Sequence, residues 1–302
     1  MSKIVVIGSA NMDVIIRVAQ IPAPGETILA RGVQLSAGGK GANQAAAIAR
    51  LGGAVTMIAC VGDDAHGQSL YAYLGEQGVD TSSIERLEGV PTGTAYINVA
   101  DDGENNIVVN PGANHHVSCE MVERYRHLLE GADYCMTQLE TPLPTLYAVA
   151  ALCQDYGVRL ILNPAPAAEL EFERLKNTWM IIPNESELNA LIPDQGDVPT
   201  KARLLLEKGF LHVLVTLGEE GCLLVDKQGE QRYSAYKALP VQDTTAAGDS
   251  FIGTLILGLS RGSSLSEAIT LATKAAAITV SRPGAQASLP TWTEVEAILG
   301  HA

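Results

Sequence analysis

The sequence predicts an α/β protein built on a doubly wound, mostly parallel sheet, with a small β-sheet lid inserted into it. Three observations carry this prediction. Short unbroken apolar runs recur along the chain, segments with helical periodicity separate them, and two stretches of alternating apolar residues interrupt this order. Unbroken apolar strands are typical of parallel sheets buried on both faces, and their alternation with helices indicates crossover connections.

The expected strands of the central sheet share an apolar run that ends in polar or turn-forming residues. They are residues 4–7, 55–61, 134–139, 159–162, 179–182 and 213–215. Helices are expected at residues 41–51, 69–77, 119–129, 145–156, 198–207, 249–259 and 265–280. A hairpin formed by residues 222–225 and 231–233 is expected at the edge of the sheet.

The two interrupting segments predict the lid. Residues 14–37 contain two short apolar runs separated by Pro22, Pro24 and Gly25, and residues 93–109 predict a hairpin around Asp101-Asp102-Gly103. We expect residues 13–37 and 93–109 to form one small sheet, and residues 1–12, 38–92 and 110–302 to form the α/β domain. Such a sheet could cover a site or pair with a second subunit.

The composition indicates a globular protein with a sizeable core, because 47% of its residues are hydrophobic and 18% are charged. A net charge of -14 and the lack of any basic cluster argue against a nucleic-acid partner. No apolar stretch approaches the roughly 20 residues that span a bilayer, so no membrane contact is expected. Five cysteines without C-x-x-C spacing are typical of reduced thiols, and they predict a cytoplasmic protein.

Polar residues follow each of the predicted strands. Ligands of open parallel sheets bind at the carboxyl ends of the strands, so this pattern predicts a polar site along one edge. The alternative is that these residues only form turns. They are Asn11, Asp13, Asp63, Glu140, Asn163, Asn184 and Thr216.

The segment Gly-Gly-Lys-Gly-Ala-Asn-Gln at residues 38–44 combines glycines with the start of an Ala-rich helix. Glycines let backbone amides approach a ligand closely, although a plain tight turn would give the same pattern. The segment is not a Walker A loop, because Gly41 stands where Ser or Thr must follow Lys40. It also lacks the third glycine of a dinucleotide fingerprint.

The segment Asp-Thr-Thr-Ala-Ala-Gly-Asp at residues 243–249 precedes a second helical run. Its small residues leave backbone N–H groups bare at a helix N-terminus, where an anion is stabilised. Asp249 beside such an anion hole could accept the proton of a hydroxyl that attacks phosphorus. A helix-capping carboxylate with no chemical role is the alternative.

These two segments resemble the signatures of the PfkB/ribokinase family of carbohydrate kinases, whose C-terminal signature is usually Asp-Thr-x-Gly-Ala-Gly-Asp. Order and spacing match from residues 8–13 to residues 284–286. Ala246 departs from the family glycine, and its methyl group is acceptable if φ is negative there. The resemblance implies a ribokinase-like fold and ATP-dependent sugar phosphorylation.

The resemblance also assigns roles to matching positions. Asp249 would be the catalytic base, with the anion hole at Ala246, Ala247 and Gly248. The sugar would be bound by Asn11, Asp13, Gly39, Lys40, Asn43 and Glu140, together with Asp249. The nucleotide would contact Asn184, Thr216, Leu217, Gly218, Glu219, Glu220, Gly221, Gly248 and Thr273. Potassium would be bound by Asp243, Thr245, Thr279, Arg282, Gly284 and Ser288, and Glu187 would act on magnesium through water.

The resemblance therefore implies phosphorylation of the terminal hydroxymethyl of a pentose, with D-ribose the first expectation. Magnesium would be bound together with ATP, and potassium would activate the enzyme. A homodimer would form through the lid. Several alternatives stay open. The chain could act on deoxyribose, another sugar or a nucleoside, or be a non-catalytic sugar- or nucleotide-binding regulator, which the intact Asp249 argues against. A dinucleotide-dependent oxidoreductase is opposed by the missing glycine fingerprint.

Overall fold

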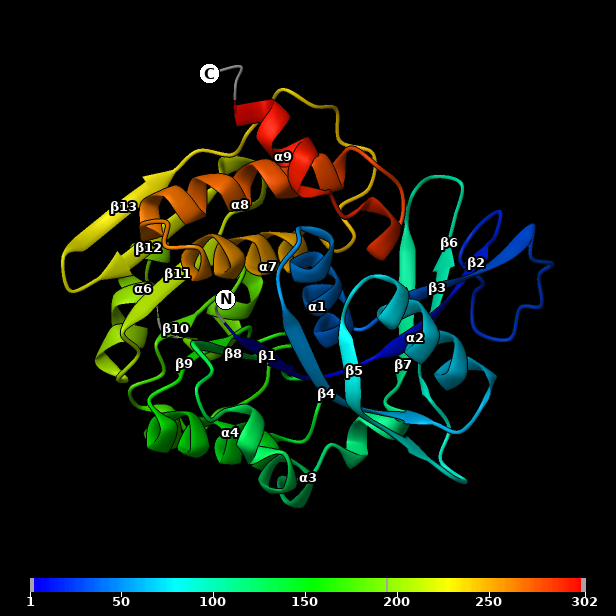
Figure 1. Cartoon of the computed structure of the whole chain (residues 1–302). Helices are drawn as coiled ribbons and strands as arrows, with labels where there is room; N and C mark the ends of the chain where they lie inside the picture. Colours follow the sequence, from blue (N-terminus) through cyan, green and yellow to red (C-terminus); the bar gives the residue numbers. More distant parts are fainter. Residues whose placement is uncertain (1–2, 194, 300–302) are drawn as a thin grey trace.

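The computed structural model describes residues 3–193 and 195–299, and these form two β-sheets with helices on both faces of the larger one (Figure 1). The strands of the larger sheet are β1 (Ile4–Ile7), β4 (Val55–Gly62), β5 (Asp80–Leu87), β8 (Tyr134–Thr137), β9 (Arg159–Leu162), β10 (Met180–Ile181), β11 (His212–Thr216), β12 (Cys222–Asp226) and β13 (Gly229–Tyr233). Their order is β13-β12-β11-β10-β9-β8-β1-β4-β5. The strands from β11 to β5 pair in parallel, and β12 and β13 add an antiparallel hairpin at the edge. The predicted fold class and edge hairpin are confirmed.

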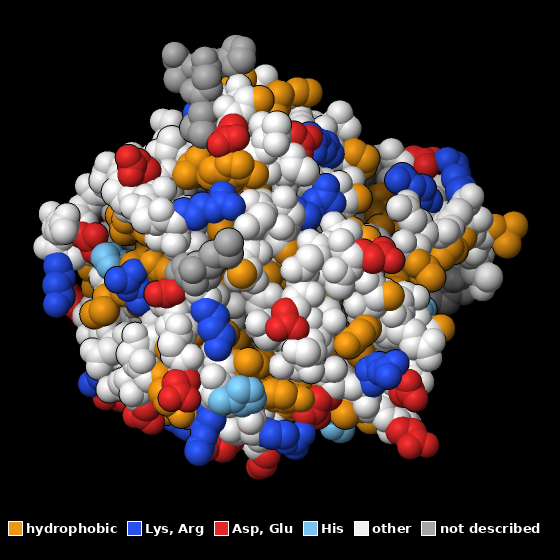
Figure 2. Space-filling view, in the orientation of Figure 1, with side chains coloured by type: hydrophobic (Ala, Val, Ile, Leu, Met, Phe, Trp, Pro, Cys, Tyr) orange, Lys and Arg blue, Asp and Glu red, His pale blue; other side chains and the backbone are white. Residues whose placement is uncertain are grey.

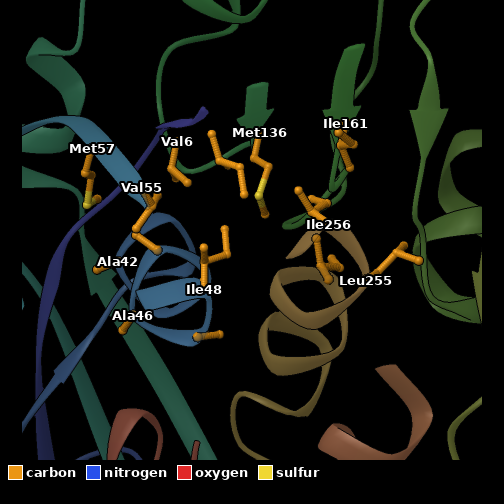
Figure 3. Close-up of a cluster of buried hydrophobic side chains, with 14 of the residues drawn as sticks. Val6, Ala42, Ala46, Ile48, Val55, Met57, Met136, Ile161, Leu255 and Ile256 are labelled. Atoms are coloured by element: carbon orange, nitrogen blue, oxygen red, sulfur yellow. The ribbon is translucent and has the colours of Figure 1, made fainter. Parts of the chain in front are cut away.

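Alternate residues of the central strands enter different cores, which explains why these strands are apolar throughout. Val6 of β1 belongs to the same buried cluster as Ile48 and Leu255 on one face of the sheet (Figure 3), whereas its neighbours Val5 and Ile7 join a separate cluster on the other face. The helices involved are α1 (Lys40–Arg50) and α7 (Ala247–Ser260) on the first face. On the second face they are α3 (Cys119–Arg124) and α4 (Leu143–Tyr156).

The remaining helices complete the two layers (Figure 1). They are α2 (Ala65–Glu76), α5 (Glu185–Leu191), α6 (Val198–Glu207), α8 (Leu265–Val280) and α9 (Trp292–Leu299). Within the described ranges, no helix is long and apolar enough to cross a membrane.

Several element boundaries differ from the predictions. The strand β5 was not predicted, because it is a half-exposed edge strand rich in polar residues. The helix expected at residues 119–129 ends at Arg124 and continues as a short 3₁₀ turn over Arg126–Leu128. The strands β8 and β10 are shorter than expected and end at Thr137 and Ile181.

The smaller sheet contains β2 (Asn11–Arg17), β3 (Gly32–Gly38), β6 (Gly93–Val99) and β7 (Asn105–Asn110), in the order β3-β2-β6-β7. Its strands come from the two segments predicted for the lid, and none of them pairs with the larger sheet. They extend one or two residues beyond the predicted inserts, so Asn11 lies on a lid strand. The division into two domains remains a prediction, and its residues 1–2, 194 and 300–302 lie outside the described ranges.

Candidate active site

The N-termini of α1 and α7 meet at the carboxyl ends of β1, β8 and β9. Two contacts fix this meeting point. The main-chain amide of Lys40, the first residue of α1, donates a hydrogen bond to Glu140 Oε2 at 3.0 Å, just after β8. Asn43 Nδ2, on the next turn of α1, donates to Asp249 Oδ2 at 2.9 Å on α7. The structure thus brings the two sequence motifs together at the edge where an α/β sheet binds ligands.

Asp249 is buried in the first turn of α7 and accepts a hydrogen bond on each carboxylate oxygen. Its second donor is Gln44 Nε2, at 2.9 Å from Oδ1. Burial raises the pKa of Asp249 above its usual range, although Lys40 and the two amides lower it, and Glu140 adds to the rise. A raised pKa gives the carboxylate the proton affinity that a general base needs.

Two further carboxylates, Asp13 and Glu140, face Asp249 across the site. Burial raises the pKa of Asp13 to about 7, and repulsion from Glu140 and Asp249 contributes. Burial alone would lower the pKa of Lys40, but the carboxylates of Asp249, Glu140 and Glu187 raise it. Carboxylates accept hydrogen bonds from vicinal hydroxyls with defined direction, so this cluster suits a polyol.

Glycines flank these side chains because there is no room for a Cβ atom. A Cβ on Gly38 would lie 2.1 Å from Asp13 Oδ2, and one on Gly93 would lie 2.3 Å from Asn11 Oδ1. Gly39 adopts φ +87°, which favours glycine, and a Cβ there would lie 2.7 Å from the main-chain nitrogen of Asn11. These glycines therefore let the lid strands pack closely against Asn11 and Asp13.

The segment before α7, where the anion hole is predicted, departs from the expectation at Ala246 and Ala247. Ala246 has φ 58° and ψ 9°, so the condition of a negative φ is wrong: the alanine occupies a left-handed position that normally favours glycine. The amide of Ala247 donates to Thr244 O at 3.3 Å. Within the described chain, no acceptor meets the amides of Gly248 and Asp249. Such free first-turn amides attract anions.

Most of the residues predicted for the nucleotide lie along the neighbouring strand ends. Asn184 caps α5 and exchanges hydrogen bonds with Glu187: each main-chain N–H donates to the other's side chain, at 2.9 and 2.8 Å. Asn184 also pairs with Thr216 in an isolated parallel bridge. The turn after Thr216 is closed by Leu217 N–H donating to Gly221 O at 2.8 Å. Burial raises the pKa of Glu187, with a contribution from Asp249, so the two sides of the site are electrostatically linked.

The predicted cation loop is assembled from two distant segments. Asp243 Oδ2 accepts from Gly284 N–H at 2.8 Å, and Oδ1 accepts from the main-chain N–H and the hydroxyl of Thr245 at 2.9 and 2.6 Å. Burial would raise the pKa of Asp243, but these hydrogen bonds lower it below its usual value. The carboxylate is therefore ionised at neutral pH.

The oxygens near this loop fit a monovalent cation. In the described part of the chain, the main-chain oxygens of Thr245, Arg282 and Gly284 accept no hydrogen bond. Carbonyl oxygens are the ligands that potassium uses in place of water. The same described residues contain no group of three or more His, Cys, Asp or Glu suited to a metal ion.

The other predicted cation ligands use their side chains elsewhere, which leaves only their main-chain oxygens for an ion. Thr279 Oγ1 donates to Ser250 Oγ at 2.8 Å, and Ser288 Oγ donates to Ala285 O at 2.7 Å. Arg282 pairs with Glu294 at 2.5 Å, and this bond holds the pKa of Glu294 near about 2.

Two predicted positions are not joined to the cluster by any hydrogen bond of the described residues. Asp63 is exposed, and its neighbour Asp64 caps α2 through Gly67 N–H instead. Thr273 donates its hydroxyl to Thr270 O within α8.

The structure also adds buried amides that were not assigned roles from the sequence. Asn114 Nδ2 donates to Asn11 Oδ1 at 2.6 Å and holds this asparagine from the loop after β7. The others are Gln44, Gln138, Asn163 and Gln286. Gln44, Asn163 and Gln286 lie in segments that the sequence pattern already singles out, whereas nothing in the sequence marks Asn114.

Comparison with known proteins places the chain in a family. It matches the pfkB family carbohydrate kinases over residues 1–292. It is 39% identical to a ribokinase of Haemophilus influenzae over 98% of both chains, and 34% identical to a deoxyribokinase of Salmonella typhi over 95% of both. Its structure resembles ribokinase of Thermotoga maritima (TM-score 0.91, 35% identity, 99% and 100% covered). It also resembles an Arabidopsis thaliana ribokinase complexed with ribose and ATP (TM-score 0.93, 31% identity, 99% of both covered). The chain belongs to the pfkB family of carbohydrate kinases.

Proposed function

We propose that this ribokinase-like kinase transfers the γ-phosphoryl group of ATP to the terminal hydroxymethyl of D-ribose, giving D-ribose 5-phosphate. One observation carries the proposal: Asp249 is buried beside the free amides of α7, with both carboxylate oxygens held by side-chain amides. The likeness to ribokinases over nearly the whole chain supports ribose as the acceptor.

In this proposal, Asp249 takes the proton of the sugar hydroxyl while the hydroxyl oxygen attacks the γ-phosphorus. The bond from phosphorus to the bridging oxygen breaks, and ADP leaves. The main-chain amides of Gly248 and Asp249 stabilise the charge that develops on the transferred group, and the dipole of α7 adds to this effect. Lys40 lies close enough to Asp249 to affect its pKa, and it offsets negative charge in the site.

The sugar would be bound by the buried side chains between the lid strands and the larger sheet. Asp13 and Glu140 would accept hydrogen bonds from its hydroxyls, while Asn11 and Asn43 would both accept and donate. Gly39 and Lys40 complete this set at the start of α1, where the main-chain amide of Lys40 already donates to Glu140. Since Asn11 and Asp13 lie on β2, the small sheet would contribute directly to sugar binding.

The nucleotide would lie along Asn184, the turn Thr216–Gly221 and α8, with Thr273 toward the base. Glu187 is engaged in capping α5 and is therefore suited to hold magnesium through water rather than directly. Magnesium supplies charge neutralisation on the phosphates when it is bound. Potassium would be bound by the oxygens around Asp243, Thr245 and Gly284, with Thr279, Arg282 and Ser288 completing the loop.

We also propose a homodimer formed through the small sheet, which acts as a lid. This sheet and its connecting loop expose large apolar residues, of which Val108 is 66% and Val33 63% exposed, and a symmetric partner would cover them. Figure 2 shows apolar side chains on this side of the molecule. On the face seen there, acidic and basic side chains are interspersed. Five free cysteines support a cytoplasmic location.

The acceptor is tested by measuring kcat/KM for ribose, 2-deoxyribose, other pentoses, hexoses and nucleosides with ATP. We expect ribose to have the largest value. A larger value for 2-deoxyribose or a nucleoside would assign the chain to a sister activity of the same family. Sugar or nucleotide binding without any turnover would instead support a non-catalytic regulator.

A further inference from the structure

Each oxygen of the Asp249 carboxylate lies at the end of a chain of two buried amides. In the first chain, Gln138 Nε2 donates to Gln44 Oε1 at 2.6 Å, and Gln44 Nε2 donates to Asp249 Oδ1 at 2.9 Å. In the second, Gln286 Nε2 donates to Asn43 Oδ1 at 3.0 Å, and Asn43 Nδ2 donates to Asp249 Oδ2 at 2.9 Å. We call these the Gln138 chain and the Gln286 chain.

The carboxylate sets the direction of both chains. Because an ionised carboxylate can only accept, Gln44 and Asn43 must turn their NH₂ groups toward Asp249. Their carbonyl oxygens then face outward, and the NH₂ groups of Gln138 and Gln286 meet them. The two outer oxygens, Gln138 Oε1 and Gln286 Oε1, are buried and accept no hydrogen bond from the residues described.

An unsatisfied buried acceptor destabilises a fold, and such groups are uncommon in native proteins. Here each chain leaves one acceptor without a hydrogen bond at its outer end, while both contacts to the Asp249 carboxylate are made. This pattern is expected where a fixed orientation of the carboxylate matters more than a hydrogen bond to the outer glutamine oxygen.

The members of the Gln138 chain are fixed from several elements. Gln44 on α1 is fully buried, and Gln138, just after β8, is 1% exposed. The second N–H of Gln44 donates to Asn163 Oδ1 at 3.2 Å, after β9. Both of its N–H groups are therefore used within the protein, which leaves none for the sugar.

Neutral amides can orient a carboxylate without greatly weakening it as a base. A cation bonded to Asp249 would stabilise the ionised form strongly and lower its proton affinity, whereas an amide N–H does so less. The charged groups that face Asp249 are Lys40 on α1, Glu140 after β8, Asp13 on β2 and Glu187 on α5. In the described chain, none of them is hydrogen-bonded to it.

We propose that Gln44, Gln138 and Gln286 are positioning residues that, together with Asn43, hold the Asp249 carboxylate in the orientation needed to take the proton of the sugar hydroxyl. The chemical role of Asp249 rests on the proposed function. The orientation of its carboxylate by the two chains does not.

The test uses Gln44→Met and Gln138→Met, which keep side-chain length and remove the amide. The ¹³Cγ signal of Asp249 is titrated in protein labelled at aspartate, and it is assigned by its loss in Asp249→Asn. We expect the pKa of Asp249 to rise in Gln44→Met, because the ionised form loses a hydrogen bond, and to rise less in Gln138→Met. The acid limb of the kcat/KM profile should move to higher pH in the same order.

We expect kcat to fall roughly tenfold or more in Gln44→Met, with the KM for sugar within about threefold of wild type. The matched control is Thr254→Val on the same helix as Asp249, which loses a buried hydrogen bond to Ser250 O at 2.7 Å. It should lose stability without moving the titration. Should Gln44→Met fail to fold, Gln138→Met still tests the Gln138 chain, because Gln138 is linked to Asp249 only through Gln44.

An unchanged Asp249 titration in both variants, with kcat no lower than in Thr254→Val, would overturn the proposal. The titration needs no turnover. A wild-type protein that phosphorylates no sugar would therefore defeat the proposed function alone, while a shifted titration would still support the positioning chains.

Discussion

The two sides of the candidate site are built differently. On the side proposed for the sugar, Asn11, Asn43 and Asp249 are buried and fixed by side-chain hydrogen bonds that originate in distant segments. On the side proposed for the nucleotide, Gly248 and the turn Gly218–Glu220 are exposed, and main-chain hydrogen bonds set the shape of this turn. The side chains proposed to bind the sugar are therefore held in place by contacts between segments far apart in the sequence. The shape of the exposed turns proposed to bind the nucleotide depends instead on local backbone conformation.

This contrast determines how substitutions should act. On the sugar side, the loss of one side-chain atom removes a specific contact and changes chemistry or sugar affinity. On the nucleotide side, changes of backbone preference or of bound ion should alter turnover or stability without altering sugar affinity.

The largest effect is expected for Asp249→Asn. Asn is nearly isosteric but cannot take the hydroxyl proton, so kcat should fall by roughly 10²–10⁴ while the protein folds normally. Steady-state kinetics measure the first effect, and circular dichroism with calorimetric titration of ribose checks the fold and the site. Activity within about threefold of wild type would show that Asp249 is not the base.

The next effect concerns the charge of Asp13. Because its pKa is about 7, Asp13 is protonated at pH 5 and loses acceptor capacity, so the KM for ribose should fall by up to roughly tenfold as pH rises from 5 to 8. The KM for ATP should not follow, and Asp13→Asn should remove the dependence. An equal pH dependence of both KM values would show that the two sides are not separable in this way.

The same shift makes a stability prediction with a definite sign. The pKa of Asp13 is raised from 3.8 to about 7 on folding, so the folded state binds the proton more tightly. The contribution of this proton binding to the stability of the folded state is complete below about pH 4 and is lost as pH rises to about 7. Thermal unfolding of the ligand-free protein, compared with Asp13→Asn, should show this loss.

A smaller effect is expected when potassium is exchanged for a bulky organic cation at constant ionic strength. If the loop around Asp243 and Gly284 binds potassium and orders the segment before α7, kcat should fall roughly fivefold and the KM for ribose should stay constant. Unchanged turnover would remove the cation site and leave the kinase assignment standing.

The smallest effect is expected for Ala246→Gly. Ala246 lies in the left-handed region, where glycine is preferred by about 1 kcal/mol, so this variant should unfold at higher denaturant concentration than wild type. Ala247→Gly, one residue on and inside α7, is the matched control and should destabilise by about 0.5–1 kcal/mol. Destabilisation by both would contradict the backbone conformation described for Ala246.

Much of this architecture could be predicted from local pattern. Strands that are apolar throughout and helices of clear periodicity led to the fold class, and the two motifs led to Asp249 and Asn43. The edge strand β5 was missed because its many polar residues make its sequence look like that of a loop. Asp63 follows β4 at the expected edge but is exposed, because a polar residue after a strand also serves in turns.

The amide chains could not be predicted, because they depend on which segments meet. Gln138 lies 94 residues from its partner Gln44 in the sequence, and Gln286 lies 243 residues from its partner Asn43. Gln44 in turn lies 205 residues from Asp249. Local propensity carries no information on such contacts. The left-handed conformation of Ala246 could not be predicted either, because alanine normally adopts a negative φ.

The central claim is tested most directly by identifying the product formed from ATP and ribose. Phosphorus and carbon NMR of the reaction mixture should show one phosphate ester per ADP, attached to the terminal hydroxymethyl of ribose, and none with Asp249→Asn. Release of inorganic phosphate without a sugar ester, or an ester at another hydroxyl of ribose, would contradict the account.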